Sequence, residues 1–556
     1  MYIAKKIAFW NVLGLYRVSA ILHQAGKDMA KKYDLHHWDN SQFKNAIILL
    51  LCLLKNKIYL VYDQNNQAVA TFQVKKQNDS FRFQKLATLP SFAGKGVGSY
   101  CLHTIEEMAK DVGCEWVALE VYDKSRHAIA FYRNRGYTVC GETSTLKYTE
   151  LKMRKKLAPK KLLVIGAGFL QSFVIKKAKE MGYFVLAVDA NPNAEGFAYT
   201  DAHAAVNIVD EKACLAYAKE QGVDGVLTAA TDYGVLTAAY IARELGLPGL
   251  DYEAAKRIKN KYLIRKCLYE NRVDDTEQAY LVDDTTDMEA LAATLTYPVM
   301  VKPCDGSGSR GANRVDGPEG LAKACAIARD ASITRRAEIE TFIFGREYGA
   351  ESLVVNGEVH VLAIMQKWMT EPPYYAELGH AIPTDLAPEV EARARDCAER
   401  AIKALDLNFG SVNMDMLITP EGKIYIIDIG ARMGGNLIGS HIIPRGTGID
   451  YMANMIRNAV GDPVDLSPVR EGAPVATRLL ALTPGEIESL PDLSSGADVI
   501  IEHHLHVGDT IREYHTNLDG CGYVVAVADT KAEAEARAEA VKNRIDAEIV
   551  RKSNNS

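Results

Sequence analysis

The chain has 556 residues, of which 48% are hydrophobic and 24% charged, and its formal net charge is −6 at pH 7. This length predicts about three to four domains, each with its own core. The negative charge and the lack of a broad basic stripe argue against nucleic acid as a partner.

Cysteine usage and hydropathy favour a cytoplasmic protein. The ten cysteines are scattered and form no CxxC pair, which is typical of a reduced chain with packed thiols. Asn11 and Arg17 interrupt the apolar run near the N-terminus, and no small-residue cleavage site follows, so we expect no signal peptide. The apolar stretch 46–54 is too short to span a bilayer and predicts a buried helix, so we expect no membrane partner. The oligomeric state stays open, with a homodimer as one alternative.

Residues 1–150 have the periodicities of an α/β domain. We predict two early helices, then strands at 58–62, 68–74 and 81–89, a helix at 99–112, a strand at 116–121, a helix at 128–134 and a strand at 138–140. The first two of these strands are expected to form a hairpin. A cluster of basic residues then indicates a linker at 151–160.

The pattern changes after residue 160. A strand at 161–165, a helix ending near Met181 and a strand at 184–189 form a βαβ unit, which predicts a parallel sheet. A strand at 224–227 and a helix at 235–245 continue this domain. The turn Gly166-Ala167-Gly168 lacks the third glycine of a dinucleotide fingerprint, so we do not expect nicotinamide binding. A helix at 533–545 is predicted near the C-terminus.

Two glycine-rich loops lie more than two hundred residues apart. The first contains Gly94, Lys95, Gly96 and Gly98, and the second runs from Asp305 to Gly311. Glycine lets backbone N–H groups approach an anion closely, and a following helix start adds partial positive charge. The two loops therefore predict two separate phosphate-bearing ligands.

The first loop and the later segment 119–137 together resemble the GNAT acetyltransferase family across residues 1–150. The resemblance implies acetyl-CoA as a ligand, with pyrophosphate at the loop glycines and Lys95. It also implies that Tyr132 is the general acid that protonates the departing thiolate. A packed aromatic is the alternative for Tyr132, and His127 is a weaker candidate for a base. The family usually has Arg or Gln where this chain has Ala93, which leaves open a module that binds coenzyme A without catalysis.

The second loop resembles the ATP-grasp superfamily, from about residue 158 to 550, and most closely its carboxylate–amine ligases, which include L-amino-acid ligases. The resemblance implies that ATP is bound by a set of residues from successive segments: Lys261, Lys302, Gly306, Ser307, Gly308, Ser309, Glu340 and Glu347. In that assignment Glu340 belongs to the hinge beside adenine, and Glu347 is the ribose-binding carboxylate.

The metal-binding segment indicates the reaction class. Asp415 and Asp428 lie on two strands joined by a turn, and antiparallel pairing would bring both carboxylates together. Hard oxygen ligands plus substrate phosphates are what Mg²⁺ requires. The resemblance implies that Arg432 stabilises charge on the transferred phosphoryl group. The family's metal-binding Asn is Gly430 here, so water, Asn413 or Asn436 is expected to take its place.

Two further segments are candidates for binding. The stretch 369–380 resembles a substrate-side loop of the amino-acid ligases, in which Tyr374 or Tyr375 would wall a pocket and Glu377 would bind an ammonium; an ordinary surface loop is the alternative. His503, His504 and His506 are expected within one strand, with His503 on the opposite face from the other two. Metal binding by these histidines is disfavoured, because no Cys or carboxylate completes a tetrahedral set.

The predicted fold class is a multi-domain α/β protein. It comprises a GNAT-like domain (1–150), a Rossmann-like pre-ATP-grasp domain (161–255), a small lid domain (256–345) and a large ATP-grasp domain with a C-terminal subdomain (346–556). The leading functional hypothesis is a bifunctional enzyme. It would join the carboxylate of an amino acid or small peptide-like acid to an amine through an acyl phosphate, and it would acetylate a small amine. The alternatives are a ligase with a non-catalytic coenzyme A module, and a carboxylase-like enzyme that activates bicarbonate.

Overall fold

The computed structural model describes residues 2–8, 10–33, 49, 52–53, 55–144, 148–157, 159–276, 279–305, 311–372 and 374–552. The chain divides into two compact units, Met1–Pro159 and Lys160–Ser556. Most of the buried helix expected at 46–54 and residues 306–310 of the second glycine loop lie outside the described residues.

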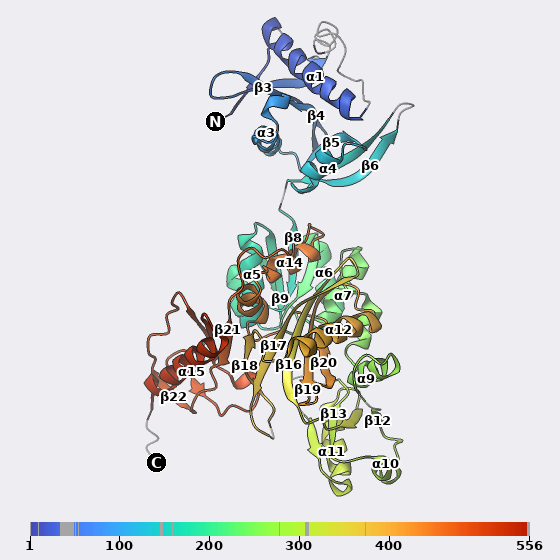
Figure 1. The fold of residues 1–556 in the computed structure, drawn as a ribbon, viewed down its shortest axis with the longest axis vertical. Helices are drawn as coiled ribbons and strands as arrows, with labels where there is room; N and C mark the ends of the chain where they lie inside the picture. Colours follow the sequence, from blue (N-terminus) through green and yellow to red (C-terminus); the bar gives the residue numbers. More distant parts are fainter. Residues whose placement is uncertain are drawn as a thin grey trace. The chain divides into compact units, whose positions relative to one another are not determined.

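The first unit is a seven-stranded sheet in the order β1-β2-β3-β4-β5-β7-β6 (Figure 1). Its strands and helices, in chain order, are β1 (Ile3–Lys6), α1 (Val12–Tyr33), β2 (Lys57–Tyr62), β3 (Ala68–Gln77), β4 (Ser80–Thr88), α3 (Val97–Asp111), β5 (Trp116–Tyr122), α4 (Arg126–Arg133), β6 (Thr138–Ser144) and β7 (Thr149–Lys156). The predicted β2–β3 hairpin and the predicted helix after the glycine loop are confirmed. Residues 151–156, for which the sequence predicts a linker, instead form β7 and pair with β5.

Both faces of this sheet are covered, because side chains alternate along each strand. Ile58 and Leu60 of β2 pack into the cluster that α1 covers, whereas Val61 packs into the cluster that includes Val97 and Leu102 of α3. β4 and β5 are the parallel pair of the sheet, and on β4 their register runs only from Ser80 to Arg82. The chain passes from β4 through the glycine loop into α3, so the loop lies where a strand gives way to a helix.

The second unit begins with the predicted parallel sheet, whose order is β10-β9-β8-β11. Its elements, with the two helices that follow, are β8 (Lys161–Ile165), α5 (Phe169–Glu180), β9 (Phe184–Asp189), β10 (Ala202–Ala205), α6 (Glu211–Gln221), β11 (Gly225–Thr228), α7 (Val235–Leu245), α8 (Tyr252–Arg257) and α9 (Lys261–Glu270). A small four-stranded sheet follows, in the order β12-β15-β13-β14. It comprises β12 (Tyr280–Val282), α10 (Met288–Thr294), β13 (Val299–Pro303), β14 (Asn313–Val315), α11 (Pro318–Ala331) and β15 (Ala337–Thr341).

An eight-stranded sheet in the order β20-β19-β16-β17-β18-β21-β25-β23 forms the centre of the second unit. Its strands and flanking helices are β16 (Arg346–Val355), β17 (Glu358–Met369), β18 (Glu377–Ile382), α12 (Pro388–Ala404), β19 (Gly410–Ile418), β20 (Ile424–Gly430), α13 (Ile443–Gly446), α14 (Tyr451–Ala459), β21 (Val475–Leu479), β23 (Val499–His503), β25 (Gly522–Val527) and α15 (Lys531–Glu548). A three-stranded sheet of β24 (Thr510–Ile511), β22 (Gly485–Ser489) and β26 (Val550–Arg551) completes the unit. In Figure 1 the small sheet with α10 and α11 lies at one end of this large sheet, and α15 lies at the other.

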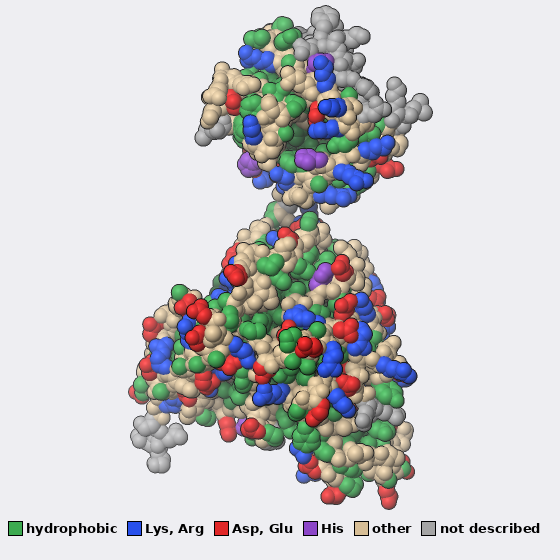
Figure 2. Space-filling model, viewed as in Figure 1, with side chains coloured by type: hydrophobic (Ala, Val, Ile, Leu, Met, Phe, Trp, Pro, Cys, Tyr) green, Lys and Arg blue, Asp and Glu red, His purple; other side chains and the backbone are tan. Residues whose placement is uncertain are grey.

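One hydrophobic cluster joins the parallel sheet to the large sheet. Val164 and Leu227 of the parallel sheet belong to the same buried cluster as Leu353 and Met365 of the large sheet, together with Ile456 of α14. This shared core fixes the carboxyl end of β11 against the large sheet, where the candidate active site lies. In the part of the chain that the structure describes, every helix is too short or too polar to cross a membrane. Figure 2 shows Lys and Arg side chains interspersed with Asp and Glu on the visible face of this unit.

Candidate active site

A cavity of about 940 Å³ lies in the second unit, between the small sheet, the large sheet and the segment after β11. It collects most of the residues that the sequence assigns to ATP, metal and substrate: Lys261, Lys302, Glu340, Glu347, Tyr375, Glu377, Asp415, Asp428 and Arg432. Of the remaining candidates in this unit, Gly306, Ser307, Gly308 and Ser309 lie outside the described residues. Residues more than 150 positions apart thus meet at one place, since the large sheet pairs strands from distant parts of the chain.

The two predicted metal ligands face each other across a strand pair. Asp415 on β19 and Asp428 on β20 are register partners in the antiparallel ladder, as the sequence predicts. Lys261 Nζ donates to Asp428 Oδ1 at 2.5 Å, and Lys367 Nζ donates to Asp415 Oδ1 at 2.8 Å. Burial by itself favours the neutral form of both carboxyls. The pKa of Asp428 is nevertheless lowered, because the charge of Lys261 outweighs burial, whereas the pKa of Asp415 is raised, because burial prevails over Lys367.

Mg²⁺ is compatible with this pair of carboxylates. Two protein carboxylates with substrate phosphates and water complete the oxygen set that this ion prefers. No group of three or more His, Cys, Asp or Glu suited to a metal occurs among the described residues, so a closed all-protein site is not formed there. Asn413 and Asn436, which the sequence offers as substitutes for the family's Asn, have both ends of their amides bonded to protein. Phosphate and water oxygens are therefore the better candidates for the remaining ligands.

Lys302 and Glu340 form an ion pair across the small sheet. β13 and β15 are antiparallel, with Met300 opposite Glu340, so Lys302 lies diagonally across from that carboxylate on the same face. Arg265 of α9 binds the second oxygen of Glu340, at 3.0 Å from its Nε. Glu340, assigned by resemblance to the hinge beside adenine, thus has its carboxylate committed to two cations. Sequence reasoning missed Arg265, although it lies four residues after Lys261.

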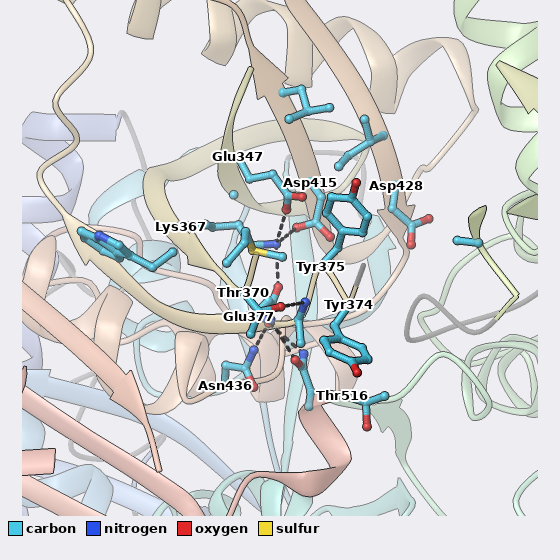
Figure 3. Close-up of a pocket in the computed structure, with 18 of the residues that line it drawn as sticks. Glu347, Lys367, Thr370, Tyr374, Tyr375, Glu377, Asp415, Asp428, Asn436 and Thr516 are labelled. Carbon is cyan, nitrogen blue, oxygen red and sulfur yellow. Dashed lines mark hydrogen bonds and ion pairs between the residues drawn. The ribbon is translucent and has the colours of Figure 1, made fainter. Parts of the chain in front are cut away.

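Lys367 of β17 is the centre of the acidic part of the cavity and was not among the predicted residues. Its ammonium lies 2.6 Å from Glu377 Oε1, 2.8 Å from Asp415 Oδ1 and 3.3 Å from Glu347 Oε2 (Figure 3). The side chain is only 1% exposed. Burial lowers the pKa of Lys367, but the three carboxylates outweigh burial and hold it well above its usual value. The available signal was a single lysine in the otherwise mostly apolar run 359–369.

Glu377 is therefore already bound to an ammonium of the protein itself. Its second carboxylate oxygen accepts from Asn517 Nδ2 at 3.0 Å and from Asn436 Nδ2. Burial raises the pKa of Glu377, but the positive charge of Lys367 outweighs it and brings the value to about 2. Further along the same strand, His380 lines the cavity, its pKa is lowered to about 4 by burial, and its Nδ1 has no hydrogen-bond partner among the described residues.

One wall of the cavity comes from the C-terminal part of the chain. The predicted loop 369–380 is shorter than expected, because β17 continues to Met369 and β18 begins at Glu377. Within this loop the Tyr374 ring stacks on His515, with centroids 4.1 Å apart, and Tyr375 has a left-handed backbone with φ of 52°. Tyr514 Oη donates to the carbonyl of Glu377 at 2.5 Å. Figure 3 shows Tyr374, Tyr375 and Thr516 along this side of the cavity.

Arg432 is held by three side-chain hydrogen bonds. Its Nε and Nη2 donate to the two oxygens of Asp232 at 2.9 and 3.2 Å, and its Nη1 donates to Asn413 Oδ1 at 3.2 Å. Asn413 Nδ2 donates in turn to Glu351 Oε2 at 2.9 Å, and Glu351 Oε1 accepts from Tyr451 Oη at 2.6 Å. Burial raises the pKa of Glu351 to about 7. Sequence reasoning missed Asp232 and Glu351, because their partners lie 200 and 62 residues away.

In the first unit, the glycine loop is exposed to solvent at Gly94, Lys95 and Gly96. Gly94 and Gly96 have φ of 76° and 79°, and no atom would lie within 4 Å of a Cβ at either position. Gly96 is the N-cap of α3, whereas Gly98 lies inside the helix against the Phe131 ring. The loop thus leaves free space beside a helix N-terminus, as an anion site requires.

Tyr132 lies in the core of the first unit rather than on its surface. Its ring contacts Phe83, Phe131 and Tyr137 at centroid distances of 5.9, 5.3 and 5.8 Å. Burial raises the pKa of its phenol above the usual value, so the group stays protonated at neutral pH. A protonated phenol is the form that an acid needs, and it is also the form expected of a packed aromatic.

The structure also describes the surroundings of two other sequence features. The turn at Gly166 is filled by Gln171, whose side chain lies 3.4 Å from where a Cβ of Gly166 would be and donates to the carbonyl of Ala229 at 2.7 Å. The expectation of three histidines within one strand is wrong, because β23 ends at His503. His504 and His506 follow the strand, where the chain turns toward Asp509.

Comparison with known proteins identifies three segments of the chain. Residues 23–137 match the acetyltransferase (GNAT) family, residues 295–440 match the ATP-grasp domain, and residues 478–550 match the L-amino acid ligase C-terminal domain 2. The last segment includes His515, Thr516 and Asn517 of the cavity wall.

Three curated relatives match over parts of their length. The chain is 27% identical over 326 residues to the uncharacterized protein y4rH of Sinorhizobium fredii, which covers 57% of this chain and 66% of that protein. It is 28% identical over 307 residues to carnosine synthase 1 of Mus musculus, with 50% and 37% covered, and 32% identical over 180 residues to D-alanine–D-alanine ligase B of Chromobacterium violaceum, with 31% and 57% covered. The chain thus spans less than two thirds of each of these relatives.

Two solved structures share the fold of the larger part of the chain. Phosphoribosylglycinamide synthetase from Anaerococcus prevotii has a TM-score of 0.61 at 23% identity, and L-amino acid ligase from Bacillus licheniformis has a TM-score of 0.60 at 22% identity. In each case 71% of this chain and all of the other chain are covered. The predicted α/β fold class and both predicted families are confirmed: the chain joins an N-terminal domain of the GNAT acetyltransferase family to an ATP-grasp domain and an L-amino acid ligase C-terminal domain.

Proposed function

We propose that the Lys160–Ser556 unit is an ATP-dependent ligase that joins the carboxylate of an amino acid or small peptide-like acid to an amine. The observation that carries this proposal is that Asp415 and Asp428 lie opposite each other on neighbouring strands. Both line the same cavity as the cations Lys261, Lys302 and Arg432. Two carboxylates for a metal and three cations for phosphates are what phosphoryl transfer to a carboxylate needs. The likeness to carnosine synthase 1 and D-alanine–D-alanine ligase B, both named as synthase or ligase, supports the same class.

The cavity residues divide naturally among the parts of ATP and its metal. Lys302 and Lys261 are suited to the phosphates, with the loop 306–309 as a cover, and Glu347 is suited to the ribose. Lys367, between three carboxylates, is also close enough to Asp415 to reach a phosphate there. Asp415 and Asp428 would hold Mg²⁺, which polarises the phosphate oxygens and neutralises their charge when bound.

In the proposed reaction a carboxylate oxygen of the substrate attacks the γ-phosphorus of ATP. The bond between that phosphorus and the bridging oxygen breaks, and ADP leaves with the electron pair. An amine then attacks the carbonyl carbon of the acyl phosphate, inorganic phosphate leaves, and the amine loses a proton as the amide forms. Arg432 stabilises the charge that develops on the transferred phosphoryl group. Water must be excluded while the acyl phosphate exists, because it would hydrolyse the anhydride.

The test is ADP release by the purified full chain with ATP, Mg²⁺ and an amino-acid pool, followed by mass spectrometry of the products. Amino-acid-dependent ADP formation together with a new amide mass supports the proposal. ADP release that is independent of every amino acid tried counts against it. Strict dependence on bicarbonate instead would indicate the carboxylase-like alternative.

We further propose that the first unit binds acetyl-CoA and transfers its acetyl group to a small amine. The open space at Gly94 and Gly96 beside the N-terminus of α3 supports binding of the pyrophosphate. The test is release of free coenzyme A thiol from acetyl-CoA in the presence of amines, by the full chain and by its Tyr132→Phe variant. Calorimetric binding of coenzyme A without thiol release from any amine would favour a non-catalytic module, for which Ala93 in place of Arg or Gln is the supporting observation.

A further inference from the structure

The two units of the chain carry opposite net charges. Residues 1–159 contain 24 Lys and Arg against 13 Asp and Glu, a formal net charge of +11, whereas residues 160–556 contain 41 against 58, a net charge of −17. In Figure 2, Lys and Arg side chains predominate over Asp and Glu on the visible face of the first unit. The overall charge of −6 therefore conceals a strongly basic domain, which attracts an anionic partner.

The same unit carries a cluster of exposed apolar side chains at the start of α1. Trp10 is 84% exposed, Val12 75%, Leu13 61% and Tyr16 54%; we call these four residues the α1 apolar cluster. Val12, Leu13 and Tyr16 share one side of the helix, since they lie within four residues of one another. Trp10 lies in the turn just before it, where its carbonyl accepts from the N–H of Val12 at 3.0 Å. Single exposed apolar residues are ordinary, but a group of large ones marks an interaction surface.

The rest of the helix fixes the outward direction of this cluster. Leu15, Val18 and Leu22 of α1 are buried in the core that the helix forms with β2. Asn11 Oδ1 accepts from the N–H of Gly14 at 2.8 Å and so caps the first turn of the helix. Turning the α1 apolar cluster inward would expose that core, so the cluster stays on the surface of the unit.

Cations lie beside the cluster. Arg17 follows Leu13 by about one helical turn, and its Nη1 donates to Tyr62 Oη at 3.5 Å. Lys5 Nζ lies 5.3 Å from the centre of the same Tyr62 ring, so it approaches the helix from β1. Lys31, near the end of α1, is exposed on the same side of the helix as Arg17. The apolar side chains are therefore bordered by positive charge.

An anionic lipid surface fits these features best. Trp and Tyr next to Lys and Arg are typical of the boundary between lipid headgroups and acyl chains. A side chain that projects as far as Trp10 enters a fluid layer directly, whereas a folded protein would need a matching pocket for it. Nucleic acid would use the charge but would leave Val12 and Leu13 in water. A second copy joined through the same cluster would bring two units of net charge +11 together, which is unfavourable.

We propose that the first unit docks on an anionic phospholipid surface through the α1 apolar cluster, with Lys5 and Arg17 at the headgroups. Such docking needs no spanning helix, and none of the described helices is suited to span. The expectation of no membrane partner rested on the short stretch 46–54 and therefore concerned spanning segments alone. Apolar burial and attraction to anionic lipid act together, so the docking requires both. It is independent of the reactions proposed for the two units.

The test is cosedimentation of the full chain with vesicles of phosphatidylcholine, with and without about one third phosphatidylserine. We expect binding to the vesicles that contain phosphatidylserine to be at least about tenfold stronger, and to fall steeply as salt is added. Arg17→Gln should weaken this binding about fivefold, the effect of one cation near the surface. Thermal unfolding of each variant, followed by circular dichroism, checks that it folds.

A matched pair of substitutions tests the apolar part. Val12 and Val469 are both 75% exposed, but Val469 lies in the second unit, so Val12→Ser should weaken vesicle binding about three- to tenfold and Val469→Ser should leave it unchanged. Trp10→Ala should lower it by at least about tenfold. The tryptophan emission of the wild type should shift to shorter wavelength with the vesicles that contain phosphatidylserine, and Trp10→Phe should lose that shift, because Trp10 enters the apolar layer.

Two kinds of result overturn the proposal. Absence of wild-type binding to the vesicles that contain phosphatidylserine at low salt excludes a lipid surface and points to an acidic protein as the partner. Binding that Trp10→Ala and Val12→Ser leave unchanged, or that Val469→Ser weakens equally, shows adsorption by charge alone or through the other unit. Equal binding to vesicles with and without phosphatidylserine removes the role of the cations and contradicts the proposal as well.

Discussion

Asp415 and Asp428 are directly opposite each other on β19 and β20, yet each is neutralised by a lysine from a different element. Lys367 of β17 reaches Asp415 at 2.8 Å, and Lys261 at the start of α9 reaches Asp428 at 2.5 Å. Two ionised carboxylates on facing residues of paired strands would repel each other without a cation. Lys261 outweighs burial and lowers the pKa of Asp428, whereas for Asp415 burial prevails over Lys367 and the pKa is raised.

This arrangement predicts that Asp428→Asn disables the ligase reaction while the chain still folds. The change removes one oxygen ligand of the proposed metal and the partner of Lys261, and we expect ADP release to fall by at least about 100-fold. The Mg²⁺ concentration for half-maximal activity should also rise, which a titration of ADP release against Mg²⁺ measures. Asp529→Asn, which changes an exposed carboxylate that does not line the cavity, is the control. An Asp428→Asn protein with an unchanged Mg²⁺ titration would exclude this carboxylate from the metal site.

Lys367 is expected to be a major contributor to stability. Lys367→Met would leave Glu347, Glu377 and Asp415 buried without their shared cation, at a cost of about 3–5 kcal/mol in the free energy of unfolding. Urea denaturation of the full chain, followed at the transition of the Lys160–Ser556 unit, measures this loss. Lys212→Met, at an exposed position of α6, is the matched control and should change stability by less than about 0.5 kcal/mol. A loss for Lys367→Met as small as that of the control would contradict the central role of Lys367.

The buried carboxyl of Glu351 predicts that the free energy of unfolding falls as the pH rises. Burial raises its pKa to about 7, above the value of an unfolded Glu, so the folded protein binds its proton more tightly than the unfolded chain. The stabilisation from the protonated carboxyl is fully present below the unfolded pKa and is lost as the pH rises through about 7. At full burial this loss amounts to about 3 kcal/mol between pH 4.5 and pH 8.

Glu351→Gln should remove this component, because the amide does not titrate. Urea denaturation at several pH values should give a flatter stability profile for Glu351→Gln than for the wild type. Glu389→Gln, at an exposed position of α12, should follow the wild-type profile. If the profiles of wild type and Glu351→Gln run parallel, the carboxyl of Glu351 does not titrate in this range.

In the acetyltransferase domain, Gly96 and Gly113 offer a matched pair of substitutions. Both have a left-handed φ, 79° and 66°, and at neither would a Cβ meet another atom within 4 Å, so alanine costs about 1–2 kcal/mol of conformational energy at each. Only Gly96 lies in the proposed pyrophosphate loop. We expect Gly96→Ala to weaken coenzyme A binding about tenfold by calorimetry, and Gly113→Ala to leave the Kd unchanged. Equal effects of the two substitutions would place the coenzyme A phosphates elsewhere.

Local sequence pattern predicted the secondary structure closely where periodicity and turn residues agree. The helix expected at 235–245 is observed as Val235–Leu245, and the strand expected at 161–165 is observed as Lys161–Ile165. The pattern misled at 151–156, where a run of basic residues suggested a linker. Those residues belong to β7. Because successive side chains of a strand point to opposite faces of the sheet, charged side chains of β7 can face solvent while Met153 is buried.

The sequence by itself determined the families, the order of the domains and the antiparallel meeting of Asp415 and Asp428, because these depend on motifs and on strands that are neighbours along the chain. Only the tertiary structure revealed three contacts. Lys367 forms ion pairs with three carboxylates, Glu351 accepts a hydrogen bond from Asn413, and Asp232 accepts hydrogen bonds from Arg432. Each of these contacts joins residues from separate elements, and in each the energy depends on burial and on the partner rather than on the residue type. The residue type of a lysine or an aspartate does not reveal which partner it contacts in the folded chain. The glycine at position 430 is likewise explained only by the structure, in which a Cβ at this position would lie close to Asp232.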